Sequence, residues 1–338
     1  TFRFRKDQPV TWHEFQNVDV TSGSAVALQR MLSSGQYKNL LVHFLDSDMW
    51  EVIEKYIDKI NVSVWVHGAE IQPWWRREYN YTDEKLLELA KKQSDIRLGF
   101  WRSILNKMHK NLKLIFVSNY FAEEVMEDIG FRLPVDQYEI IHNPVDTDLF
   151  DYVPKSSEQR LKVLSIRPYA SRKYANDLSV NAVLELSKQP FFNEFEFLFM
   201  GDGKLFDETL APIAHFDNVK IERRFLAQTD IAKYHKEFGV FLCPTRMDAQ
   251  GVSKDEAMSS GLVVISNAVT AIPEFIDEKS GLLSEGEDFK GMAESLQKLY
   301  MSKQLFTELS ENSAKRARKQ VGKAKIVQSE LRIFNELG

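Results

Sequence analysis

The sequence holds a single cysteine, Cys243, among 338 residues. One thiol excludes a disulfide framework and any zinc site built from cysteines, and it fits a reducing compartment. Long apolar runs are also missing, since no stretch reaches the roughly 18 residues that would span a bilayer. The start of the sequence shows no signal-peptide pattern. We therefore expect a cytoplasmic protein.

Basic residues are too few for a dedicated nucleic-acid binder. The chain has 44 lysines and arginines against 49 acidic residues, which gives a net charge of −5 at pH 7, whereas nucleic-acid-binding domains are normally basic. We expect no nucleic-acid partner. Hydrophobic residues make up 43% and charged residues 28% of the chain, near the globular average, so a disordered or fibrous chain is excluded. The length suggests two domains.

Short apolar segments alternate with helical ones along most of the chain. Residues 38–45, 62–67 and 112–118 have the composition of buried strands, and the segments 47–57 and 82–111 between them have a helical pattern. Such alternation predicts parallel sheets covered by helices on both faces.

A polar, turn-rich stretch between Asn143 and Ser157 interrupts this pattern, and a second series of strands and helices follows it. We therefore predict an N-terminal Rossmann-like domain over residues 1–152 and a C-terminal one over residues 153–320. A C-terminal helix over residues 321–338 is expected to pack back on the N-terminal domain. Before residue 38 the sequence offers one strand-like piece and no glycine-rich turn, so we expect the first domain to lack its first strand and that turn.

Ligands of open parallel sheets bind beyond the carboxyl ends of the strands, so residues that directly follow predicted strands are candidate site residues. Gly251 precedes a predicted helix, whose free backbone N–H groups and dipole favour anions. Arg167 and Lys173 follow another strand and add positive charge for the same anion. Asp248 and Glu256 repel phosphate but suit sugar hydroxyls. The pattern indicates a nucleotide-sugar site.

Each of these features also has a purely structural interpretation. Ser253-x-x-Glu256 matches a capping box, which would make Glu256 a helix start. Gly201-Asp-Gly203 lacks the third glycine of a dinucleotide fingerprint. His67 at a strand end is often a structural histidine, and Arg172–Lys173 is by default a solvated surface pair.

In combination, the motifs resemble those of retaining GT-B glycosyltransferases of the large family four, also called glycosyltransferase group 1. The segment from Asp248 through Glu256-Ala-Met258 is similar to that family's carboxylate, seven residues, then Glu-Ala-Met. Ile140-Ile-His-Asn-Pro-Val-Asp146 and Leu198-Phe-Met-Gly-Asp-Gly203 fall in the family's order. The similarity runs from about residue 38 to about residue 319, and it suggests bacterial surface polysaccharide biosynthesis.

The resemblance implies a GT-B fold, with two facing doubly wound Rossmann-like domains and a helical C-terminal tail. It implies that the N-terminal domain binds the acceptor and the C-terminal domain binds the nucleotide-sugar donor. It also implies metal-independent transfer of a hexose from a nucleoside-diphosphate-sugar to an acceptor hydroxyl with retention of configuration, without a cofactor. The implied catalytic residues are His67, Asp248, Arg167 and Lys173. The implied donor-binding residues are Glu256, Gly251, Val252, Gly201, Arg172 and Gln250.

Three departures from the family pattern matter for the donor. Asp248 stands where the family usually has glutamate, which shortens its reach by one methylene. Ala249-Gln250 replaces the usual Gly-Phe, so we expect a polar side chain to face the donor. The spacing from Arg167 to Lys173 is one residue longer than expected, which leaves either Arg172 or Lys173 as the phosphate cation.

Two other classes stay open, an epimerase-like GT-B nucleotide-sugar protein and a non-catalytic binding module of a larger assembly protein. The tail also carries a cluster of cations, which is either a solvated helix face or an attraction to anionic lipid. Its members are Lys315, Arg316, Arg318, Lys319, Lys323 and Lys325. We expect a glycan or lipid-linked acceptor, and reversible association with the inner membrane surface.

Overall fold

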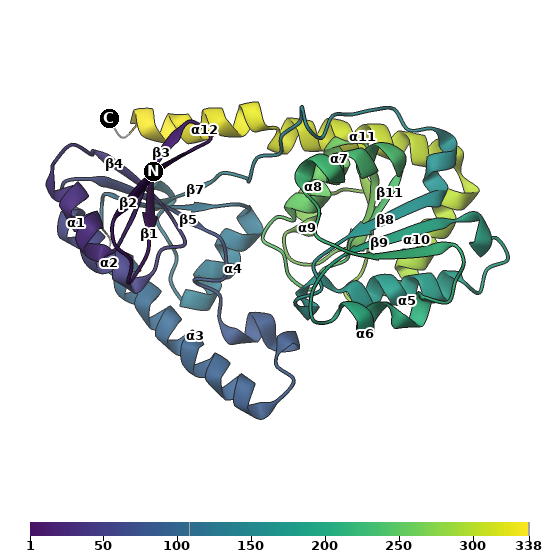
Figure 1. Ribbon diagram of the computed structural model, residues 1–338, viewed down its shortest axis with the longest axis horizontal. Coiled ribbons are helices and arrows are strands. Elements are labelled where there is room, and N and C mark those ends of the chain that lie inside the picture. Colours follow the sequence, from purple (N-terminus) through teal and green to yellow (C-terminus); the bar gives the residue numbers. More distant parts are fainter. Residues whose placement is uncertain (108, 337–338) are drawn as a thin grey trace.

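The computed structural model describes residues 1–107 and 109–336, and it shows two α/β units side by side (Figure 1). The N-terminal unit contains a four-stranded parallel sheet in the order β4-β5-β6-β7. Its strands are β4 (Asn39–His43), β5 (Asn61–Val66), β6 (Leu112–Phe116) and β7 (Tyr138–Ile140). The connecting helices are α2 (Ser47–Ile53), α3 (Glu84–Leu105) and α4 (Asn119–Ile129). The predicted alternation of strands and helices is confirmed here.

The segment before β4 holds more structure than the sequence indicated. Its elements are β1 (Phe2–Phe4), β2 (Thr11–Phe15), β3 (Val18–Gly23) and α1 (Ala25–Ser33). The prediction of a single strand was wrong for two reasons. First, β2 is exposed along its whole length and shows no apolar face. Second, the hairpin turns at Gln16 and Asn17, which both adopt positive φ, instead of at a glycine.

The C-terminal unit is built on a six-stranded parallel sheet in the order β10-β9-β8-β11-β12-β13. Its strands are β8 (Lys162–Ile166), β9 (Glu196–Gly201), β10 (Val219–Arg223), β11 (Val240–Leu242), β12 (Val263–Asn267) and β13 (Gly281–Ser284). The strand order reverses between β8 and β11, which makes the crevice beyond their carboxyl ends the expected ligand position.

Helices cover both faces of this sheet, and apolar residues of the strands fill two separate cores, one on each face. The helices are α5 (Asn176–Leu186), α6 (Phe206–Leu210), α7 (Gln228–Glu237), α8 (Val252–Ser259), α9 (Ile272–Phe275), α10 (Phe289–Met301) and α11 (Lys303–Val321). Near-continuous apolar strands such as β12 are what burial on both faces requires.

The last helix, α12 (Lys323–Glu336), returns to the N-terminal unit and lies across it (Figure 1). Ile326 and Ile333 of α12 belong to a core cluster with Trp65 and Ile115 of the N-terminal sheet. Two segments therefore cross between the units, the linker after β7 and the junction of α11 with α12. Among the described residues, no helix is long and apolar enough to cross a membrane.

Gly201 ends β9 where the neighbouring strand β8 comes closest. Its φ is +151°, and a Cβ atom built there would lie 1.9 Å from the carbonyl oxygen of Arg167. Only a residue without a side chain permits this approach. The glycine thereby fixes the position of the residue that directly follows β8.

We predict that Gly201→Ala destabilises the protein by about 2–5 kcal/mol, because the clash adds to backbone strain. Urea unfolding followed by circular dichroism measures this loss. Gly286→Ala is the matched control in the same unit, since a Cβ atom there meets open space, and it should change stability by less than about 0.5 kcal/mol. Equal stability of the two variants would contradict the packing argument.

Candidate functional site

A cavity of about 110 Å³, here called the cleft cavity, lies between the two units. Its N-terminal lining is His67, Gln72, Arg77, Val117 and Asn143, and its C-terminal lining is Lys173, Met247, Asp248, Ala249, Gln250, Gly251 and Val252. The structure thus brings together residues from both units that the sequence analysis selected separately. They come from the ends of strands and from the loops that follow them.

Two of the predicted cations share one aromatic support. The guanidinium of Arg167 lies 5.1 Å from the centre of the Tyr174 ring, and the ammonium of Lys173 lies 5.6 Å from it. Arg167 is only 5% exposed and donates from Nη1 to Ser253 Oγ at 3.0 Å. Its Nε is buried and has no partner within the described part of the chain. An anion at this place would supply the missing acceptor.

Arg77, which the sequence analysis missed, adds a third cation from the other unit. It lies on the short helix η2 (Trp74–Asn80) and donates from Nη2 to Gln72 Oε1 at 3.0 Å. Like Arg167, it has a buried Nε without a partner among the described residues. The available signal was the pair Arg76–Arg77, which begins ten residues beyond the end of β5, but such pairs are common on exposed surfaces.

The electrostatic balance of the cleft cavity is positive. Burial lowers the pKa of Lys173, the charge of Asp248 opposes this, and the charges of Arg77 and Arg167 lower the pKa further. Lys173 thus has two cations and one carboxylate as charged neighbours, while Arg77 also interacts with the carboxylate of Glu70. A bound anion would relieve this repulsion, as expected of a diphosphate site.

Helix α8 begins at the cleft cavity, and no side chain caps its first turn. Its N-cap is Gly251, with φ of +86°, and no side chain caps the helix. Ser253 lies inside the helix, where its hydroxyl accepts from Arg167. The capping-box interpretation of Ser253 and Glu256 is therefore excluded. The first backbone N–H groups of α8, beginning at Val252, are left for an anionic ligand.

His67 is held in a defined orientation on the opposite wall. Its Nε2 lies 2.9 Å from Nδ1 of His43, and its ring stacks on Phe44 with 4.3 Å between centres. The backbone N–H of His67 donates to Glu70 Oε1 at 2.6 Å. Burial lowers the pKa of His67, so the imidazole is neutral at pH 7. A neutral, oriented imidazole suits hydrogen bonding to a sugar hydroxyl.

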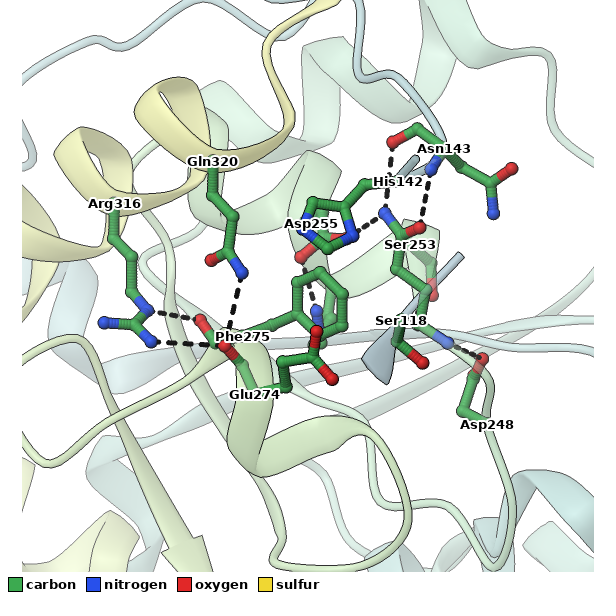
Figure 2. Close-up of polar contacts among 12 residues, drawn as sticks. Ser118, His142, Asn143, Asp248, Ser253, Asp255, Glu274, Phe275, Arg316 and Gln320 are labelled. Atoms are coloured by element: carbon green, nitrogen blue, oxygen red, sulfur yellow. Dashed lines mark hydrogen bonds and ion pairs between the residues drawn. The ribbon is translucent and has the colours of Figure 1, made fainter. Parts of the chain in front are cut away.

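Gln250 lines the cleft cavity, but protein groups already bond its side-chain amide. Its Oε1 accepts from Asn143 N at 2.7 Å, and its Nε2 donates to Asn143 O at 3.1 Å and to Asp255 Oδ2 at 2.9 Å. Asp248 Oδ1 accepts from the backbone N–H of Gln250 at 3.2 Å (Figure 2). The amide thus ties its own loop to the linker between the units.

The remaining predicted residues lie around the cleft cavity without lining it. Glu256 is 8% exposed and accepts from Gln228 Nε2 at 3.2 Å. Gly201 packs against the backbone of Arg167. Arg172 lines a different cavity, whereas Lys173 lines this one. Geometry therefore favours Lys173 as the phosphate cation.

Contacts across the cleft hold the two units together around the cavity. Glu274 of α9 caps helix α4 of the other unit, accepting from the backbone N–H groups of Asn119 at 3.0 Å and Tyr120 at 3.1 Å. Arg316 and Gln320 of α11 in turn donate to the carbonyl of Glu274 (Figure 2). These hydrogen bonds connect α4 of the N-terminal unit to α9 and α11 of the C-terminal unit.

Comparison with known proteins shows which family part of this chain is similar to. Residues 162–302 match the family model described as Glycosyl transferases group 1. The amylovoran biosynthesis glycosyltransferase AmsK of Erwinia amylovora is 26% identical over 214 residues, which are 59% of this chain and 52% of that protein. The chain therefore spans about half the length of this curated relative.

Solved structures show the same fold at low sequence identity. A sucrose-phosphate synthase from Thermosynechococcus elongatus superposes with a TM-score of 0.75 at 16% identity, over 99% of this chain and 88% of that one. TarM of S. aureus, in complex with fondaparinux, alpha-GlcNAc-glycerol and UDP, gives 0.64 at 19% identity over 85% and 53%. Anabaena HepE with UDP and glucose gives 0.70 at 12% identity over 95% and 87%. The predicted GT-B fold is confirmed, and so is the resemblance to the group 1 glycosyltransferases.

The buried carboxyl of Glu256 generates a prediction about pH. Burial, aided by the charge of Asp255, raises its pKa to about 7, whereas the unfolded chain titrates near its ordinary value of about 4.3. Between these values the folded state holds a proton that the unfolded state has released, so stability falls as pH rises. We expect wild type to lose up to about 3 kcal/mol relative to Glu256→Gln between pH 5 and pH 8.

Urea unfolding at a series of pH values measures this difference. Glu278→Gln serves as the control, because Glu278 is exposed, and its curve should run parallel to that of wild type. A parallel curve for Glu256→Gln as well would show that the carboxyl is not perturbed.

Proposed function

We propose that this GT-B chain transfers a hexose from a nucleoside-diphosphate-sugar to a hydroxyl of a glycan or lipid-linked acceptor, in bacterial polysaccharide assembly. The observation that carries the proposal is the convergence of Arg77, Arg167 and Lys173 on the open start of α8. The family match, and the UDP in complexes of TarM and HepE, support the same substrate class. Uridine diphosphate is therefore the first nucleotide to test.

In this proposal the protein's own cations receive the charge of the leaving diphosphate. Negative charge develops on the diphosphate as the bond to the sugar breaks, and prepositioned donors stabilise it without reorganisation. The unpartnered Nε atoms of Arg77 and Arg167 gain acceptors at that moment. Three cations and a helix start offset the diphosphate charge, so we propose that transfer requires no metal.

The sugar lies between the walls of the cleft cavity in this arrangement. His67, neutral and held by His43, bonds a sugar hydroxyl near the reacting carbon, while Asp248 accepts from other hydroxyls. Glu256, which lies on α8 but does not line the cleft cavity, accepts from the ribose hydroxyls. Departure of the diphosphate toward Lys173, with the acceptor arriving on the same face of the sugar, would retain the configuration.

Nucleotide binding tests the proposal directly. Uridine diphosphate at 100 times its dissociation constant should stabilise the protein by roughly 2.7 kcal/mol in thermal unfolding. Lys173→Gln should weaken binding by about tenfold or more, because a hydrogen bond to a charged group is lost. Lys204→Gln, at an exposed position outside the cavity, should bind as wild type does. Sugar transfer should continue in excess EDTA.

Several outcomes would count against it. Stabilisation by none of the nucleoside diphosphates would overturn the donor site, and activity lost in EDTA but restored by magnesium would overturn the metal-free mechanism. Product analysis separates the alternatives, since an epimerase-like protein converts the nucleotide-sugar without an acceptor. A non-catalytic binding module would bind nucleotide without turnover. Inversion at the anomeric carbon would refute retention alone.

Membrane association is a second proposal. It concerns only those cations of the C-terminal tail that are not turned toward the protein. Arg316 donates to the carbonyl of Phe275 at 2.7 Å, and Arg318 donates to that of Thr147 at 3.0 Å, so both are turned toward the protein. The exposed cations are Lys315, Lys319, Lys323 and Lys325. We propose that these four lysines attract anionic lipid at the inner membrane surface, near a lipid-linked acceptor.

Co-sedimentation with phosphatidylserine-containing vesicles tests this attraction. Binding should weaken with added salt, and the double variant Lys319→Gln/Lys325→Gln should bind at least tenfold more weakly, at about 1 kcal/mol per lysine. Lys279→Gln/Lys290→Gln, which removes two exposed lysines elsewhere, controls for net charge. Salt-insensitive binding, or equal binding by both double variants, would refute the electrostatic account.

A further inference from the structure

A second cavity, here called the side cavity, has a volume of about 460 Å³ and lies beside the cleft cavity. Tyr79 of η2 forms its N-terminal wall, and α5, α6 and the short helix η5 (Arg172–Tyr174) contribute the opposite side. We propose that the side cavity binds a neutral saccharide unit of the acceptor glycan. This inference rests on the proposed glycosyltransferase function, which it extends from the donor to the acceptor.

Two unpartnered polar atoms belong to residues that line the side cavity. Asn176 is 7% exposed, and its Nδ2 donates to the carbonyl of Pro168 at 2.9 Å. That bond fixes the orientation of the amide, and Oδ1 is left buried without a partner among the described residues. The hydroxyl of Tyr79 is also buried and has no hydrogen-bond partner among the described residues. A buried polar group without a partner is costly, so both atoms call for a hydrogen-bonding ligand.

The two unpartnered atoms need ligand groups of opposite kinds: the hydroxyl of Tyr79 needs an acceptor, and Oδ1 of Asn176 needs a donor. Burial raises the pKa of Tyr79 to about 12, so its hydroxyl stays protonated and can donate. Asn176 Oδ1 can only accept. A sugar hydroxyl both donates and accepts, so the hydroxyls of a saccharide can satisfy both kinds of atom.

The rest of the lining fits an uncharged sugar better than a phosphate. The carboxylates of Asp177 and Glu208 lie in the wall and repel anions. The lining also holds two arginines, so its formal charges balance: Arg246 is paired with Asp177 at 2.6 Å and with Glu287 at 2.7 Å, and Arg172 is the other. Val180 adds an apolar surface against which the C–H face of a pyranose can pack. The volume lies within the ~300–1,000 Å³ range of small-molecule sites.

The position of the side cavity connects it to the transfer reaction. Tyr79 lines the side cavity and Arg77, two residues earlier, lines the cleft cavity. On the opposite unit, Arg172 and Lys173 divide in the same way between the two cavities. The elements η2 and η5 therefore form a shared wall. A glycan held in the side cavity can extend past that wall toward the donor.

Saturation-transfer NMR with four neutral disaccharides, maltose, cellobiose, lactose and diacetylchitobiose, tests the inference without a donor. We expect at least one of them to bind to the wild-type chain. Thr209→Trp, which places a large ring in the lining, should abolish the signal, and Ala211→Trp, at an exposed position outside it, should not. Tyr79→Phe removes only the unpartnered hydroxyl and should weaken binding three- to tenfold, with Tyr37→Phe as its exposed control.

Nucleotide-induced stabilisation, measured on the same variants, separates this inference from the proposed function. It should be unchanged in Tyr79→Phe and Thr209→Trp. Binding by none of the disaccharides, or equal binding by wild type, Tyr79→Phe and Thr209→Trp, would overturn the saccharide site even if nucleotide binds. If disaccharides bind as expected and nucleotides do not, the donor proposal fails and the saccharide site stands. Loss in Tyr79→Phe is informative even if Thr209→Trp does not fold.

Discussion

The side-chain amide of Gln250 is bonded to both backbone groups of Asn143, and this contact ties the loop before α8 to the linker between the units. Gln250 is 1% exposed, so breaking the contact would leave several buried groups without partners, each at a cost of about 1–3 kcal/mol. Its third partner is Asp255 in the first turn of α8. The direction of α8, and with it the anion-binding start of the helix, is therefore set by an interdomain contact.

Most of the buried charged residues around this contact are neutralised by partners within the protein. Lys254 and Asp255 are both almost fully buried and pair with each other, and the Lys254 ammonium lies 4.2 Å from the centre of the Phe275 ring. Arg246 at the outer wall is likewise neutralised by two carboxylates. Lys173 in the cleft cavity is different, because the charge of Asp248 raises its pKa while the charges of Arg77 and Arg167 lower it. Positive charge therefore outweighs negative charge around Lys173.

Much of the C-terminal unit could be predicted from the sequence because its signals are local. Buried parallel strands such as β9 are continuous apolar runs, and the topology alone makes the residues that follow them candidate site residues. The residues that the N-terminal unit contributes to the candidate site were harder to predict from the sequence. Arg77 lies on an irregular short helix, and only the tertiary structure brings it opposite Lys173.

Two further points were beyond the sequence for physical reasons. Ser253-x-x-Glu256 has the spacing of a capping box, but it can act as one only if Ser253 is the N-cap of the helix. The N-cap is instead the left-handed Gly251, two residues earlier, so Ser253 lies inside the helix. Ala249-Gln250 stands where the family usually has Gly-Phe, so the sequence predicted a polar side chain facing the donor. In the structure the amide of Gln250 is bonded to Asn143, more than a hundred residues away, which the sequence does not reveal. The absence of a first strand and glycine-rich turn stays a prediction.

The two chain crossings between the units also constrain how the protein can move. Val145 of the first crossing forms a β-bridge with Gly322 of the second, with Val145 N donating to Val321 O at 2.8 Å and Lys323 N donating to Val145 O at 2.9 Å. Because the two crossing segments are hydrogen-bonded to each other, they act as one hinge. Sliding or twisting of one unit against the other would break these hydrogen bonds. Only a swing about that axis preserves them. Such a swing would pull Glu274 away from the first backbone N–H groups of helix α4, which would keep Ser118 as its own N-cap.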